Sequence, residues 1–117
     1  MQVTIPTNKG NITIDNQVIA TIAGISAMES YGIVGMASKN AADGIFQLLK
    51  FENLTKGISV NSENERIRIQ LHVIIEFGIR ISTVGQNVID RVRFNVESLT
   101  GLEVEDIEVL VEGIRMD

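Results

Sequence analysis

The sequence has no cysteine and no tryptophan, and its 117 residues include one histidine, one proline and one tyrosine. The lack of cysteine excludes thiol nucleophiles, disulfide frameworks and zinc sites built on cysteine. The histidine, His72, has no companions for a Ser-His-Asp triad and stands on the polar side of an alternating segment, which favours a solvated or cross-strand role over that of a ligand or base. Neither a Gly-x-Ser-x-Gly turn nor a Gly-Lys-Ser/Thr phosphate cradle occurs. We therefore expect no enzyme activity, no cofactor and no metal.

Long hydrophobic runs and targeting signals are also missing. No apolar run approaches the length that spans a bilayer, and the start of the chain lacks the basic region and hydrophobic stretch of a secretory signal. There is no linker, low-complexity tract or repeat. A chain of this length buries roughly two thirds of its unfolded surface, which is enough to fold without disulfide bonds. We expect one cytoplasmic domain spanning residues 1–117.

Positive charge is scarce at the C-terminal end. The net charge is −5, and up to Leu102 nine Lys and Arg residues balance nine Asp and Glu residues, so the excess lies in the last fifteen residues. This distribution argues against binding to nucleic acid or to an anionic membrane. A solvated face is the favoured interpretation, and an electrostatic docking site for a basic partner is the alternative. The acidic residues are Glu103, Glu105, Asp106, Glu108, Glu112 and Asp117.

Residues 16–28 contain no charge and predict a helix capped by Asp15. One face is predicted to pack on a sheet, while the small face allows a second backbone to approach closely, from this chain or from a neighbouring subunit. We predict that the small face is an interaction surface of a homo-oligomer. Large aliphatic side chains fall on one side of this helix at 100° per residue, namely Val18, Ile19, Ile22 and Ile25. Small residues gather on the opposite side, namely Ala20, Ala23, Gly24 and Ala27.

The rest of the first half is predicted from shorter patterns. Alternation over residues 10–14 predicts a strand that runs into the first helix, and Val3 and Ile5 either extend this strand or fray ahead of Pro6. Residues 33–36 predict a short apolar strand, and the aliphatic spacing in residues 42–49 suggests a short second helix.

The second half has the clearest periodicity. A strand from Ile58 turns at residues 61–65 and returns as a long strand over residues 66–77, in which every second residue from Ile67 to Phe77 is apolar and the intervening residues are mostly polar. A long amphipathic helix follows, predicted from a cap at Ser82 to a stop at Gly101, and residues 107–112 form a last strand. The fold class is α+β: a small mixed sheet of about five strands, with two main helices on one face and one short helix. The apolar side of the long helix comprises Ile81, Val84, Val88, Val92, Val96 and Leu99.

Two aromatic residues and one motif bear on contacts. Phe94 lies off the valine stripe, so it is either an exposed anchor for a partner or a residue covered by residues 39–57. Tyr31 is predicted to pack at the end of the first helix. Gly32-Ile33-Val34-Gly35 matches the Gly-x-x-Gly pattern of KH domains, but its central residues are apolar and the charge of the chain is wrong for RNA.

Eight segments along the chain carry a recognisable pattern, namely Gly10-Asn11-Ile12-Thr13-Ile14, Val18-Ile19, Ile22-Ala23, Gly32-Ile33-Val34-Gly35-Met36, Lys56-Gly57-Ile58, Phe77-Gly78-Ile79-Arg80-Ile81, Asn87-Val88 and Val109-Leu110-Val111-Glu112-Gly113-Ile114. Together they resemble the alkaline shock protein or YloU-like family. The resemblance covers nearly the whole chain. It implies a small cytoplasmic protein without known catalysis, found chiefly in Gram-positive bacteria and linked with envelope stress, which self-assembles and in some members reaches the membrane through a separate anchoring protein.

The resemblance and the residues together favour a non-catalytic interaction or scaffold protein. We expect a homo-oligomer with a membrane-anchored protein partner, without nucleic acid and without direct membrane insertion. The alternative is a regulatory or small-ligand-binding subunit of a fatty-acid or dihydroxyacetone kinase-like enzyme. A pocket lined by Phe46, Leu49 and Phe51 would favour this alternative. KH-like RNA binding is the second alternative.

Overall fold

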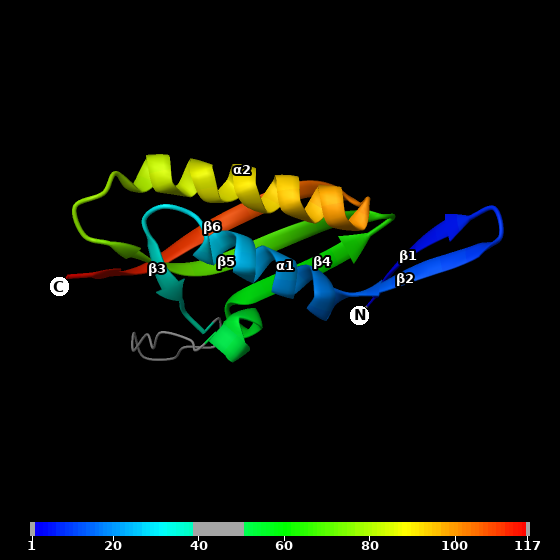
Figure 1. Ribbon diagram of the computed structural model, residues 1–117, viewed down its shortest axis with the longest axis horizontal. Coiled ribbons are helices and arrows are strands. Elements are labelled where there is room, and N and C mark those ends of the chain that lie inside the picture. Colours follow the sequence, from blue (N-terminus) through cyan, green and yellow to red (C-terminus); the bar gives the residue numbers. More distant parts are fainter. Residues whose placement is uncertain (1, 39–50, 117) are drawn as a thin grey trace.

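The computed structural model describes residues 2–38 and 51–116, and it confirms an α+β fold (Figure 1). The predicted short helix at residues 42–49 lies outside the described residues. The 3₁₀ helix η1 (Phe51–Gly57) precedes β4. In chain order the other elements are β1 (Gln2–Thr7), β2 (Gly10–Asp15), α1 (Asn16–Met28), β3 (Ile33–Met36), β4 (Ile58–Glu63), β5 (Arg66–Glu76), α2 (Ile81–Thr100) and β6 (Glu103–Arg115).

Strand β5 is the centre of a mixed, four-stranded sheet. It forms an antiparallel hairpin with β4 through Asn64 and Glu65, which both have positive φ. The end of β5 pairs antiparallel with β3, on the same edge as β4. On its other edge β5 pairs with β6 in parallel, because α2 carries the chain back across the sheet between these two strands. Strand β6 thereby extends to thirteen residues, longer at both ends than the predicted residues 107–112.

The core lies between this sheet and the two helices, which pack on one of its faces (Figure 1). The predicted alternation of β5 is confirmed within the strand, where the inward side chains are buried. Phe77 is the exception: it follows the end of β5 and is 61% exposed, because the chain turns at Gly78, whose φ is 94°. The inward side chains of β5 are Ile67, Ile69, Leu71, Val73 and Ile75, and they face Val84, Val88, Val92 and Val96 of α2.

The first strand differs from the prediction. Val3 and Ile5 neither extend β2 nor fray; they belong to β1, which pairs antiparallel with β2 in a separate two-stranded sheet. Pro6 is tolerated there because β1 lies at an edge and need not donate at every position. Val3 is buried in the main core and Ile5 and Ile14 pack partly against it, whereas the turn end of the hairpin projects from the domain and lengthens it to 54 × 27 × 20 Å (Figure 1).

Helix α2 begins earlier than predicted. Its N-cap is Arg80, with no side-chain cap bond, so Ser82 lies inside the first turn. The predicted stop is confirmed, since Gly101 adopts the left-handed conformation with φ 77°. Ile81 and Leu99 are exposed, in contrast to the prediction, because only the four valines at a spacing of four residues face the sheet.

Candidate interaction surfaces

The small face of α1 lies inside the chain's own core. Ala20, Ala23 and Ala27 are at most 5% exposed. A Cβ atom added at Gly24 would lie 3.1 Å from Ile58 Cδ1 and 3.3 Å from Leu54 Cβ, so β4 and η1 occupy the close approach that this face allows. In the monomer these four residues of α1 are therefore not accessible to a second subunit, and the small face serves intramolecular packing.

The large aliphatic side of α1 faces outward, in contrast to the predicted packing on the sheet. Ile19 alone of its four side chains is fully buried, and Ile22 packs partly against the core. Val18 is 49% and Ile25 38% exposed. The reason is volume: large side chains of β5 and α2 already fill the sheet face, so the helix comes close only with its small side. We call Val18, Ile22 and Ile25 the outer stripe.

A groove with two exposed aromatic side chains lies between the C-terminal end of α1 and the middle of α2. Tyr31 is 72% exposed, so its predicted packing role is wrong, and Phe94 is 69% exposed, as expected for a surface anchor. The groove has a volume of about 540 Å³. We call it the aromatic groove; it is lined by Ser30, Tyr31, Asn87, Asp90, Arg91, Phe94 and Asn95.

Polar contacts hold the walls of the aromatic groove together. Asn95 Nδ2 donates to Ser26 Oγ at 2.8 Å, and this hydroxyl donates to the carbonyl of Ile22 at 2.7 Å. Arg91 Nη1 lies 4.0 Å from Glu29 Oε1. The bond from Asn95 ties α2 to α1, while the bond from Ser26 to Ile22 lies within α1, so the aromatic groove and the outer stripe belong to one packed pair of helices.

The acidic residues of β6 lie opposite the polar side chains of β5. Arg66 Nε is 3.7 Å from Glu103 Oε2, and Arg68 Nη2 is 3.3 Å from Glu105 Oε1. The hydrogen bond and charge of Glu105 raise the pKa of Arg68. These contacts agree with a solvated, charge-paired face at the start of the strand.

His72 is a cross-strand partner, as predicted. Its Nδ1 atom lies 2.7 Å from Glu112 Oε1, and two residues earlier on the same side Gln70 Nε2 donates to Glu108 Oε1 at 2.9 Å. These two contacts join the polar sides of β5 and β6. Residues 2–38 and 51–116 contain no group of three His, Asp or Glu side chains that could hold a metal ion.

The Gly-x-x-Gly segment serves the fold. Gly32 has φ 91° and turns the chain into β3, where Ile33 and Met36 are buried. A clamp for a nucleic-acid backbone needs an exposed loop, and this segment is largely covered. The helices that the structure describes include none long and apolar enough to cross a membrane.

The chain is similar to known proteins over nearly its whole length. The chain is 41% identical to the uncharacterized protein YloU of Bacillus subtilis and 42% identical to the uncharacterized protein Spy1614 of Streptococcus pyogenes; each match covers 99% of this chain and at least 97% of the relative. A stress response regulator gls24 homolog of Streptococcus pyogenes is 23% identical, over 92% of this chain and 60% of its own length.

Solved structures share the fold, and a family model matches the sequence. A zinc form of MamM CTD superimposes with a TM-score of 0.53 at 9% identity, covering 86% of this chain and 88% of that one, which shows a common fold alone. The family model matches residues 4–116, and the family is described as having a cell envelope-related function. With full-length relatives above 40% identity as well, the chain belongs to the alkaline shock protein 23 family.

Proposed function

We propose that this protein is a non-catalytic scaffold in an envelope-related process, acting through self-association and through contact with a partner protein. The observation that carries the proposal is the outer stripe: a charge-free helix exposes Val18 and Ile25 to solvent. An apolar face without a single charge is suited to a protein contact. Membership in a family with an envelope-related function supports the assignment to an envelope-related process.

Magnitudes indicate how far such an interface extends. Completing the burial of a half-exposed aliphatic side chain contributes about 1 kcal/mol, so Val18 and Ile25 of two copies together contribute roughly 4 kcal/mol. Association costs at least about 4 kcal/mol in lost translational and rotational freedom. The stripe alone therefore gives weak binding, and a stable dimer also needs the aromatic groove, where Tyr31 and Phe94 supply large exposed rings.

Light scattering between about 1 and 100 μM tests self-association, a range in which weak dimers form. We expect the wild type to form a dimer or larger species, and Val18→Glu/Ile25→Glu to be monomeric, because each copy would bury two unpaired carboxylates. Asn8→Glu/Asn11→Glu is the control, since it adds the same two charges at exposed positions of the β1–β2 hairpin, outside both surfaces. A wild type that is monomeric throughout, or an assembly that tolerates both stripe substitutions, would refute self-association through this surface.

A membrane-anchored protein remains the proposed partner class. Of the alternatives, the small-ligand-binding subunit depends on Phe46, Leu49 and Phe51, whose side chains lie outside the described part of the chain. RNA binding is opposed by the net charge of −5 and by the buried β3 segment. A polyanion column at low salt tests the RNA alternative, because we expect this chain to flow through.

A further inference from the structure

Strand β6 has one long edge that no described strand covers. It pairs with β5 along its whole length on one side. On the other side, residues 2–38 and 51–116 provide no pairing strand. An open edge of this length presents a row of backbone donors and acceptors, which folded proteins normally cover or protect.

The hydrogen-bond pattern identifies the backbone groups at this edge. The carbonyl of His72 accepts from the N–H of Ala37 at 2.9 Å, so the even-numbered residues of β5 point toward β3 and β4. The odd-numbered residues therefore bond to β6. In a parallel ladder the register partner of such a residue points away from it. The partners of Ile69, Leu71 and Val73 are Ile107, Val109 and Val111, whose N–H and C=O groups consequently face outward.

Helix α2 closes only the beginning of this edge. Val104, the partner of Ile67, faces outward by the same rule. Its N–H donates to Glu97 Oε2 at 2.9 Å, and its carbonyl accepts from Arg93 Nη1. No such side-chain bond reaches Ile107, Val109 or Val111 in the described part of the chain, so the open section begins at Ile107.

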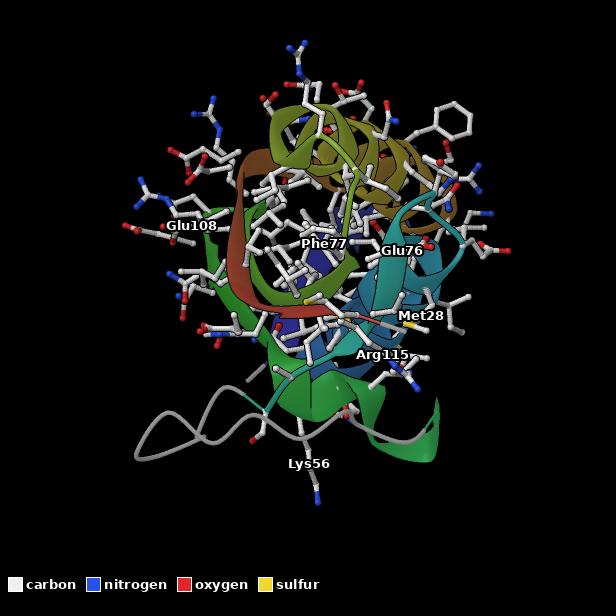
Figure 2. All side chains as sticks on the ribbon, turned by 90° about the vertical axis from the view of Figure 1, so that its left-hand side faces the viewer. Met28, Lys56, Glu76, Phe77, Glu108 and Arg115 are labelled. Carbon is white, nitrogen blue, oxygen red and sulfur yellow. The ribbon has the colours of Figure 1, made fainter. Side chains whose placement is uncertain are left out.

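Charge indicates what this open section accepts. Strand β6 carries five acidic residues and one arginine, a net charge of −4. Beyond Arg68, the β5 side chains that contact its acidic residues are Gln70, beside Glu108, and His72, beside Glu112, so neither lysine nor arginine of β5 pairs with these two carboxylates. Figure 2 shows Glu108 on the outside of the sheet, pointing away from both helices.

A second copy fits this edge poorly. Antiparallel pairing of two β6 strands about Val109 would place Asp106 of each strand opposite Glu112 of the other, and like charges directly opposite are destabilising. A basic strand meets attraction at the same positions. On the other face of β6, Val111 is 36% and Ile114 51% exposed, so apolar side chains are available to an added strand there.

We propose that the edge of β6 from Ile107 to Ile114 binds an extended segment of a partner protein in which basic and apolar residues alternate. The segment adds as a further strand, with its backbone bonded to Ile107, Val109 and Val111 and its basic side chains beside Asp106, Glu108 and Glu112. Strand addition obtains affinity from the backbone and specificity from alternate side chains. The inference rests on the proposed function, since it names the chemistry of the partner.

Fluorescence polarisation with a labelled peptide of about nine residues, a typical strand length, tests the proposal. The probe alternates valine and lysine. Two derivatives carry N-methyl groups on one or the other alternate set of backbone nitrogens, and a third has the same composition in block order. We expect the unmodified probe to bind, one methylated derivative to bind at least about tenfold more weakly, and the other to bind normally, because an added strand uses one of its edges.

The chain supplies matched variants for the same experiment. Asp106→Asn/Glu108→Gln should weaken binding of the alternating probe several-fold, whereas Glu29→Gln/Asp90→Asn, which removes the same two charges from the helix side, should not. Equal binding of both methylated derivatives, or equal binding of the block-order peptide, would show attraction by charge alone and overturn the proposal. So would the absence of binding.

The stripe variant separates this inference from self-association. Val18→Glu/Ile25→Glu leaves β6 intact, so we expect it to bind the alternating probe with unchanged affinity. If the wild type proves monomeric and still binds the probe at one peptide edge, self-association fails and the strand-addition site stands. If the protein assembles and the probe does not bind, the reverse holds.

Discussion

Gly32 stands where a larger residue would meet both backbone strain and a steric clash. Its φ is 91°, and a Cβ atom there would lie 2.6 Å from Val84 Cγ2 in the core. We expect Gly32→Ala to lower the free energy of unfolding by about 2–4 kcal/mol, from combined strain and overpacking. Urea denaturation measures the change. Gly85→Ala is the control: its Cβ meets open space inside α2, so it should raise stability by up to about 1 kcal/mol.

Neighbouring residues of β5 differ sharply in their expected contributions. Leu71 is fully buried, and Leu71→Ala should cost about 2–4 kcal/mol through lost burial and a cavity. His72 points to the other side, where it contacts Glu112, and His72→Ala should cost about 1 kcal/mol or less. Thermal melts of both variants provide the comparison. Equal losses would contradict the register of β5.

Single positions were predictable where a period constrained them. The alternation of β5 placed Leu71 inside and His72 outside because a strand has only two sides. Tyr31 and Phe77 have no such constraint, since both stand in turns beyond the ends of elements, next to glycines with positive φ. Whether their side chains are exposed depends on which distant segments pack beside the turns, and the local sequence pattern does not predict this.

At the scale of elements, helix α1 shows what periodicity leaves open. The angle between its small and large faces was predictable from the spacing of residues, and the Asp15 cap is confirmed, since its side chain accepts from Gln17 N–H at 2.8 Å. Which face turns inward depends on the space left by other elements. The small face, with Ala20, Ala23, Gly24 and Ala27, is buried within the chain, so the outer stripe replaces it as the candidate contact surface of α1. Phe94, which is exposed, stays a candidate contact residue.

The β1–β2 hairpin is the element with the least support. A two-stranded sheet is marginal in water without a partner, and only its Val3 end is fully buried in the core. We expect amides near the tip, around Thr7 and Gly10, to exchange with deuterium faster than those of β5 by orders of magnitude, as for other locally opening segments. Mass spectrometry of exchanged peptides measures this. Protection of the tip equal to that of β5 would mean that a further contact covers it.

At the scale of the whole molecule, charge governs the response to lipid. The chain carries a net charge of −5, and no described helix opposes an apolar stripe with a basic face. We expect the purified protein to stay in the supernatant with anionic liposomes at physiological salt, because attraction is absent and β6 adds repulsion. Sedimentation followed by gel analysis measures the bound share. Tight binding would identify the outer stripe as a lipid contact.

The architecture as a whole was largely predictable, because strand, helix and strand in succession favour a parallel pair joined by a crossover. Two features were not. The separate hairpin depends on the pairing of β1 with β2, which brings Val3 to the core. The length of β6 depends on its pairing with β5, which keeps Glu103 and Arg115 in the strand although both residues have a weak preference for β structure. Both are consequences of contacts between distant segments.

The contacts of Arg93 and Glu97 with Val104 also limit how a guest strand could slide. Strands with repetitive side chains slip along one another unless something halts them. Here side chains of α2 already bond the N–H and C=O groups of Val104, so an added strand cannot pair at that end of β6. Slippage in that direction is blocked, which favours a single alignment of basic residues with Asp106, Glu108 and Glu112.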